Sequence, residues 1–209
     1  VARKDGGFER ALKSADVLIP DGIGIVIASK MLRGSLSGRV TGSDIFAGVN
    51  RACDRRGGVR YFFLGSTDET LGKIRTRMAH DFPRITVAGT YAPPFRNDFS
   101  ESDTAEMVRR VNESSPHVLW VGMTAPKQEK WISEHRNRMN VSFIGAIGAV
   151  FDFYAGNIRR SHPVFQGMGL EWLPRLFQEP RRLWRRTIVS APGFIVRVLQ
   201  ERWRKREKR

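Results

Sequence analysis

Short apolar runs alternate along the chain with longer stretches whose apolar residues recur every three or four positions. The runs are mostly rich in β-branched or aromatic residues and end near Gly or Pro, which predicts buried strands over 17–19, 59–64, 85–88, 117–121 and 141–144. The stretches between them predict helices over 42–55, 68–81, 102–114 and 127–138. This alternation predicts an α/β fold, a Rossmann-like parallel sheet with helices on both faces.

The pattern changes toward the C-terminus, where Trp and Arg residues are set in helical stretches interrupted by Pro180 and Pro192. We therefore expect two domains: an α/β domain over residues 1–156, which carries the chemistry, and a basic, helical C-terminal appendage over residues 157–209. The chain begins without Met in what resembles the middle of a helix, so we expect a further N-terminal segment in the natural protein.

The positive charge is concentrated in that appendage. The whole chain has a formal net charge of +15, and residues 170–209 hold twelve Lys and Arg against four Asp and Glu. Such an excess indicates a polyanionic partner, which is nucleic acid, an anionic lipid surface or a phosphorylated substrate. The single cysteine, Cys53, excludes an internal disulfide, and no run reaches the roughly 18 apolar residues of a membrane-spanning helix.

The carboxyl ends of the predicted strands are the places to seek chemistry, because parallel α/β sheets bind their ligands there. Asp21 follows the first strand and suits a general base that takes a proton from an attacking hydroxyl, but a helix N-cap explains it equally well. Gly65 and Ser66 follow the second strand and open a helix, whose free N–H groups favour an anion or a nucleotide. Neither GxGxxG nor GxxxxGK(S/T) occurs, so the dinucleotide fingerprint and the P-loop are absent from the sequence.

Polar groups also crowd two other helix starts. Arg39 can reach a phosphate, Thr41 can cap the following helix and Asp44 can bind sugar hydroxyls or an arginine, although a capped helix beside a solvated arginine is the simpler explanation. The second start is formed by Pro126, Lys127, Gln128 and Glu129. There the amide of Gln128 suits contacts to a base or a sugar, and an exposed polar first turn is the alternative.

An acid and an arginine set follow. Asp152 sits among apolar residues and needs a partner, which is either a ligand or an arginine in a structural ion pair. Further along, the spacing of Arg175, Arg182 and Arg185 suits one face of a helix pair, and guanidinium groups bind phosphate in bidentate fashion. A solvated basic face is the ordinary alternative, but the interleaved Trp and Leu residues favour docking.

The last segment, residues 194–209, is apolar and then basic. Such segments lie on anionic membranes, with packing on the α/β domain as the alternative. The four histidines are scattered, no metal-ligand spacing occurs and no DxD is present. If the site handles a diphosphate, arginines therefore have to take the place of a metal.

These motifs, in this order, resemble the WecG/TagA/CpsF family of bacterial glycosyltransferases. The matching segments cover almost the whole chain: residues 15–24 (ADVLIPDGIG), 39–44 (RVTGSD), 126–129 (PKQE), 145–156 and 169–182 (GLEWLPRLFQEPRR). Two departures stand out. A family segment that precedes the first of these motifs is missing, and Arg160-Ser161-His162 replaces the family's usual Arg-Ala-Pro.

The resemblance implies an inverting transfer of an N-acetylmannosamine-type or related sugar from a UDP-sugar to a polyprenyl-diphosphate-linked saccharide, in teichoic acid, common antigen or exopolysaccharide synthesis. It implies Asp21 as the base, Arg39 near the active site, and Arg175, Arg182 and Arg185 closing over the donor diphosphate. No cofactor or metal is implied, and the appendage is expected to hold the protein on the cytoplasmic face of the inner membrane. Self-association is a further possibility that the family raises.

On this basis the donor is expected at the carboxyl edge of the sheet, near Gly65, residues 126–129 and Gly148. A non-catalytic module that binds polyanions or nucleic acid is the main alternative; charge supports it, but no nucleic-acid motif does. A nicotinamide-dependent oxidoreductase on the same class of sheet is disfavoured by the missing glycine fingerprint.

Overall fold

In the computed structural model, residues 5–158 and 190–207 are described. The chain divides into two compact units, which we call the sheet unit (residues 1–18 and 42–159) and the helix-pair unit (residues 19–41 and 160–209). The predicted boundary at 156/157 stays a prediction, because residues 159–189, at the start of the predicted appendage, lie outside the described ranges. Residues 19–41, which the sequence placed with the α/β domain, here belong with the C-terminal residues.

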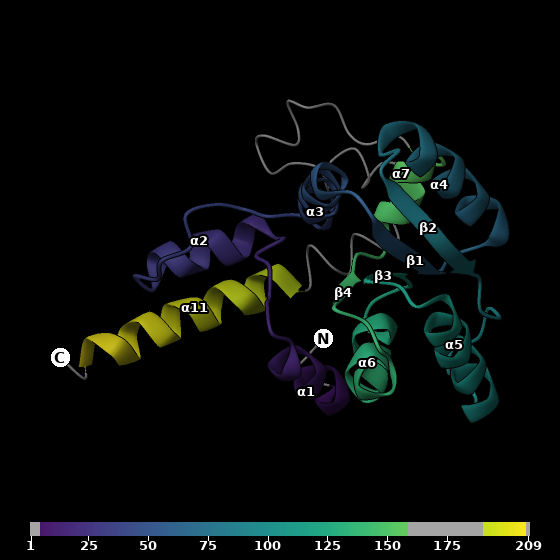
Figure 1. Cartoon of the computed structure of the whole chain (residues 1–209). Coiled ribbons are helices and arrows are strands. Elements are labelled where there is room, and N and C mark those ends of the chain that lie inside the picture. Colours follow the sequence, from purple (N-terminus) through teal and green to yellow (C-terminus); the bar gives the residue numbers. More distant parts are fainter. Residues whose placement is uncertain (1–4, 159–189, 208–209) are drawn as a thin grey trace. The chain divides into compact units, whose positions relative to one another are not determined.

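The sheet unit is built on four parallel strands in the order β2-β1-β3-β4 (Figure 1). The strands are β1 (Val59–Gly65), β2 (Ile85–Tyr91), β3 (Val118–Gly122) and β4 (Phe143–Ala146). The predicted parallel α/β sheet is confirmed, and the strands lie within two residues of their predicted bounds, except that β2 extends three residues beyond its predicted end. Because β2 lies on one side of β1 and β3 on the other, the chain reverses its direction of winding between β1 and β3.

Helices cover both faces of this sheet, as predicted. On one face lie α3 (Gly42–Arg56), α4 (Asp68–Asp81) and α7 (Val150–Ala155); on the other lie α5 (Glu101–Ser114) and α6 (Lys127–His135), which a 3-10 turn (Arg136–Arg138) extends. Side chains of β1 alternate between the two cores, Tyr61 and Phe63 packing into the first and Phe62 and Leu64 into the second. All four are at most 2% exposed, since a sheet covered on both faces needs apolar residues at every position.

The fifth predicted strand, over 17–19, is wrong. Residues 15–20 form no strand, and Val17 and Leu18 are 78% and 59% exposed. A strand needs a neighbour to satisfy its backbone groups, and this short segment, closed by Pro20, joins the two compact units instead of entering a sheet. Just before it, α1 (Gly6–Ser14) begins at the N-cap Asp5 and packs on α6.

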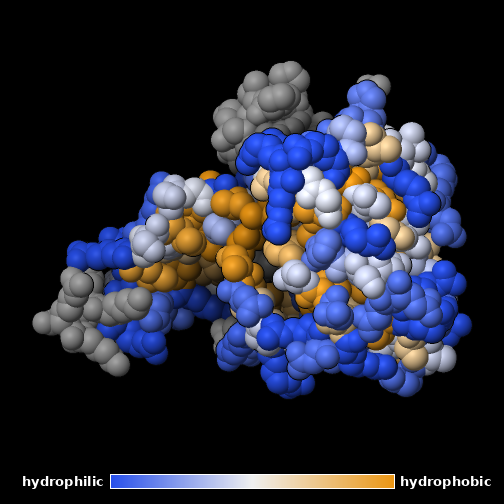
Figure 2. Space-filling view, viewed as in Figure 1, coloured by the Kyte–Doolittle hydropathy of each residue, from blue (hydrophilic) through white to orange (hydrophobic). Residues whose placement is uncertain are grey.

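The described part of the helix-pair unit contains α2 (Ile23–Met31) and α11 (Ser190–Glu207), which pack on each other. The predicted C-terminal helix is thus present as α11, whereas α2 was not among the predicted helices. Figure 2 shows apolar residues (orange) beside hydrophilic ones (blue) on this pair of helices. Within residues 5–158 and 190–207, no helix is both long and apolar enough to cross a membrane.

Candidate functional site

The carboxyl ends of β1 and β3 meet where the winding of the sheet reverses. Gly65 pairs with Gly122, and the N–H of Ser66 donates to the Gly122 carbonyl at 3.1 Å. In open α/β sheets a reversal of this kind opens a crevice at the carboxyl edge, where ligands bind. Two of the predicted site residues, Gly65 and Ser66, lie at this position.

Glycine is required at Gly65 by both its conformation and its surroundings. Its φ of +119° is rarely adopted by residues with a side chain, and a Cβ there would lie 2.5 Å from the Gly122 carbonyl oxygen. The next residue, Ser66, also has positive φ, at 58°. The chain therefore turns sharply out of β1 and leads through the N-cap Thr67 into α4.

Gln128 ties the loop after β3 to the loop after β4. Its side chain is buried, at 5% exposure, and its Oε1 accepts from the N–H of Met123 at 3.3 Å and from the N–H of Gly148 at 3.2 Å. Gly148 has a φ of +45° and lies close to the Gln128 amide. Two further predicted site residues thus meet beside the same crevice, where Gln128 fixes the shape of the backbone.

Glu129 lies in the first turn of α6, next to this clamp. Its Oε1 accepts from Gln128 Nε2 at 2.9 Å, whereas its Oε2 is buried and has no hydrogen-bond partner among the described residues. A buried carboxylate oxygen without a donor is costly, so a site of this kind normally has a further partner. Pro126 is the N-cap residue of the same helix, whose dipole favours a negative charge in its first turn.

Lys127 is held by protein groups. Its Nζ donates to the Arg96 carbonyl at 2.5 Å and lies 3.4 Å from the centre of the Phe99 ring. Burial lowers the pKa of this ammonium group, while nearby Asp98 and Asp103 oppose the shift. The contacts fasten the loop after β2 to the start of α6, so that Lys127 shapes the rim of the crevice.

Three other predicted residues come together in the helix-pair unit. The N–H of Val40 donates to the Pro20 carbonyl at 3.2 Å, so the loop that carries Arg39 and Thr41 runs beside Asp21. Asp21 is exposed, Arg39 is half-buried and Thr41 is buried. The N-cap of α2 is Gly22, so capping, the alternative explanation for Asp21, does not apply.

The remaining predicted site residues are Asp44, Asp152 and three arginines of the appendage. Asp44 is exposed in the first turn of α3. Asp152 is half-buried, less enclosed than its apolar neighbours in sequence suggested, and accepts a long hydrogen bond from Asn157 Nδ2 at 3.4 Å. The predicted arginine set, Arg175, Arg182 and Arg185, lies outside the described residues.

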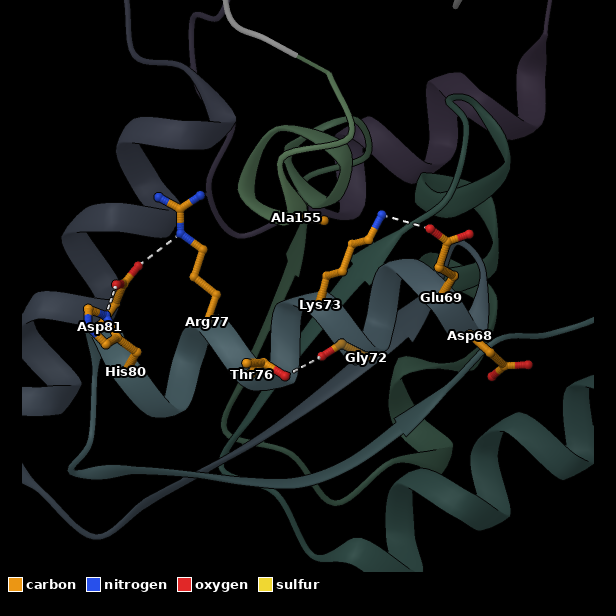
Figure 3. A pocket seen from close by; sticks show the side chains of 9 residues that line it. All are labelled: Asp68, Glu69, Gly72, Lys73, Thr76, Arg77, His80, Asp81 and Ala155. Atoms are coloured by element: carbon orange, nitrogen blue, oxygen red, sulfur yellow. Dashed lines mark hydrogen bonds and ion pairs between the residues drawn. The ribbon is translucent and has the colours of Figure 1, made fainter.

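An open depression of about 800 Å³ runs along α4, and most of its charged groups pair with one another (Figure 3). Lys73 pairs with Glu69 at 2.7 Å and Arg77 with Asp81 at 3.1 Å. Because the depression follows the helix instead of the carboxyl edge of the sheet, we do not assign it as the site. It shows how α4 is stabilised.

Sequence reasoning placed Gly122 at the end of a predicted strand without assigning it to the site, and it missed Phe99. Gly122 supplies the carbonyl that accepts from the Ser66 N–H, and Phe99 supplies the ring under Lys127. Nothing local points to Phe99, because Phe99 and Lys127 are brought together only by the fold.

A scan against protein-family models matches residues 1–208 to the Glycosyl transferase WecG/TagA/CpsF family. The chain belongs to this family. The resemblance drawn from the motifs is confirmed, and so is the expectation of a hexosyltransferase.

Curated relatives give the same result. The following three are each named N-acetylglucosaminyldiphosphoundecaprenol N-acetyl-β-D-mannosaminyltransferase. The protein from Bacillus spizizenii is 32% identical over 95% of this chain and 74% of its own length. That from Bacillus subtilis is 27% identical over 96% and 75%, and that from Staphylococcus aureus strain MW2 is 26% identical over 90% and 70%.

Proposed function

We propose that this glycosyltransferase moves an N-acetylmannosamine-type sugar from a UDP-sugar to a polyprenyl-diphosphate-linked saccharide, with inversion at the anomeric carbon and without a metal. The names of the relatives support the sugar and the lipid-linked acceptor. The observation that carries the donor site is the buried Glu129 Oε2, which lacks a hydrogen-bond donor among the described residues, next to the carboxyl end of β3. A ribose or sugar hydroxyl satisfies that oxygen.

The proposed donor site uses mostly backbone groups. The turn at Gly65 and Ser66 and the loop at Gly148 are proposed to present their backbone groups to the nucleotide, and Gln128 keeps the loops after β3 and β4 in place. The N-terminal ends of α4 and α6 favour the negative diphosphate through their helix dipoles. Arg175, Arg182 and Arg185 are proposed to neutralise the leaving UDP, the role that a metal has in other transferases.

Asp21 is the proposed base. It takes the proton from the acceptor hydroxyl as that oxygen bonds to the anomeric carbon and the bond from carbon to the UDP oxygen breaks. Arg39 and Thr41 lie on the loop beside it and are proposed to orient the acceptor diphosphate and the carboxylate; Asp44 and Asp152 are proposed as contacts to sugar hydroxyls. We further propose that the protein works peripherally on the cytoplasmic face of the membrane and that it can self-associate.

Calorimetric titration of UDP into the whole chain, with EDTA present, tests the donor site. We expect binding that EDTA does not change and that weakens about 10-fold or more in Glu129→Gln, because a hydrogen bond to a charged group is lost. Glu134→Gln is the matched control: it changes an exposed carboxylate on the same helix and should leave UDP affinity unaltered.

Two results would reject the proposal. Equal UDP affinity in the wild-type chain and Glu129→Gln would remove Glu129 from the site. Absence of UDP binding, together with salt-dependent binding to any duplex DNA, would favour the polyanion-binding alternative, since a basic surface of that kind is insensitive to sequence.

A further inference from the structure

The two described helices of the helix-pair unit, α2 and α11, share a small apolar seam. A Cβ placed at Gly24 would lie 3.8 Å from the Phe194 ring, and Val26, Ala28 and Val198 are each less than 9% exposed. This seam uses only part of the apolar surface of α2. The sequence of the helix, IGIVIASKM, has a single charged residue, Lys30, in its last turn.

The rest of α2 is apolar and open to solvent. Ile23, Ile25 and Ile27 are 41%, 47% and 52% exposed. A helix that is apolar on nearly all sides is normally buried, either in a protein core or against lipid. The neighbouring helix adds five more exposed apolar side chains, namely Phe194, Ile195, Val196, Leu199 and Trp203. A cluster of this size on two touching helices indicates an interaction surface.

The charges around this cluster select its partner. Lys30 and Arg33 follow the isoleucines of α2, and Arg197, Arg202 and Arg204 are exposed on α11. Glu201, the one acid on α11 whose surroundings are described, pairs with Arg204 at 2.9 Å. An apolar face with a basic rim matches an anionic bilayer, where isoleucines enter the acyl region and long cationic side chains reach the phosphates. A second copy of the chain would bring like charges together.

We propose that α2, together with α11, is a membrane-docking helix that inserts Ile23 and Ile27, one turn apart on the same face, into an anionic bilayer. Asp21 precedes Ile23 by two residues, a span of about 7 Å at most. Docking of α2 therefore holds Asp21 at the depth of the lipid phosphates, with the Arg39–Thr41 loop beside it through the hydrogen bond from Val40 to Pro20. That Asp21 acts there as the base on a lipid-linked acceptor rests on the proposed function.

Vesicle co-sedimentation of the whole chain tests the surface alone, with no sugar nucleotide present. The probes are vesicles of phosphatidylcholine with about one-third phosphatidylglycerol, and vesicles of phosphatidylcholine only. We expect preference for the anionic vesicles and a loss of affinity of about 10-fold or more in Ile23→Ser/Ile27→Ser, since two half-exposed apolar side chains no longer enter lipid. The matched control, Phe95→Ser/Phe143→Ser, removes two exposed apolar side chains from the sheet unit and should bind as the wild-type chain does.

A fluorophore placed at Ile27→Cys in a Cys53→Ser background gives a second measurement. We expect its emission to shift to the blue on anionic vesicles and to be quenched by nitroxides located in the acyl region. Wild-type vesicle affinity in the α2 double variant, or an unquenched probe, would overturn the proposal. A change of oligomeric state with unchanged vesicle affinity would instead assign the face to contact between copies.

The same variants separate this inference from the proposed function. UDP affinity should be unaltered in Ile23→Ser/Ile27→Ser, and transfer should fall for a long-chain acceptor in vesicles while it persists for a short-chain, water-soluble one. If the wild-type chain binds UDP but Ile23→Ser/Ile27→Ser binds vesicles as the wild-type chain does, only the docking helix is rejected. If the wild-type chain does not bind UDP but the α2 double variant loses vesicle affinity, only the transferase reaction is rejected.

Discussion

The carboxyl edge of the sheet and the α2–α11 pair use their polar and apolar groups in opposite ways. At the sheet edge, Gln128 turns inward to bind two backbone N–H groups, and Gly65 lets two strand ends approach closely. On the helix pair, three isoleucines of α2 face solvent and charges lie at the rim. A site for a polar ligand requires a fixed backbone, whereas contact with a fluid lipid surface requires only the right composition on one face.

The largest effect is expected at Asp21, and it should be confined to turnover. In Asp21→Asn the acceptor hydroxyl loses its base, so kcat should fall by roughly 10²–10⁴-fold. UDP affinity and vesicle binding should stay at wild-type values. Transfer of radiolabelled sugar under saturating donor measures this, with Asp98→Asn, an exposed carboxylate of the sheet unit, as the control. Retained turnover would remove Asp21 from the role of base.

A large effect on folding is expected where the carboxyl ends of β1 and β3 pair, at Gly65. Gly65→Ala forces a side chain into a φ of +119° and against the Gly122 carbonyl, which should lower the free energy of unfolding by about 3 kcal/mol. Urea denaturation measures this loss. Gly72→Ala is the control, because that position in α4 has open space around it and should gain up to about 1 kcal/mol. Equal stabilities in the two variants would contradict the close approach seen at Gly65.

A smaller effect is expected when the clamp between the two loops is removed. Gln128→Ala leaves the Met123 N–H without its acceptor and the Gly148 N–H with only the long hydrogen bond to the Val121 carbonyl at 3.4 Å. This should cost about 2 kcal/mol in urea denaturation and weaken UDP binding. Vesicle binding should not change, because the clamp lies in the sheet unit. Gln200→Ala, at an exposed position of α11, should leave both stability and UDP affinity at their wild-type values. Unchanged UDP binding in Gln128→Ala would separate the clamp from the donor site.

The smallest effect is expected at the start of α5, away from both regions. Ser100 and Asp103 form a capping box, and Ser100→Ala should cost about 1 kcal/mol. Hydrogen bonds from Ser100 lower the pKa of Asp103 below its ordinary 3.8. The full stabilisation by this carboxylate is therefore present above the unfolded-state pKa of 3.8. It is lost as the pH falls through the lower pKa of the folded state. Urea titrations at pH 7 and near pH 3 should show a smaller difference between variant and wild type at the acid pH.

Periodicity located the sheet well, because strands buried on both faces and amphipathic helices carry strong local signals. The runs VRYFFL and HVLWV became the two central strands β1 and β3. The same reasoning failed at 17–19, where three apolar residues resembled a strand but have no strand beside them. It also overlooked α2, since IGIVIASKM is apolar without a helical period and short apolar runs do not distinguish helix from strand.

The sequence by itself determined the family and the class of fold, because ordered motifs and hydrophobic periodicity are local properties that survive without coordinates. It also pointed to Gly65, Gln128, Glu129 and Gly148 one at a time. Only the tertiary structure decided that Gln128 joins two loops, that the Lys127 ammonium packs over the Phe99 ring and that the isoleucines of α2 are exposed. These facts depend on which residues distant in the chain become neighbours, and that depends on the packing of the whole chain.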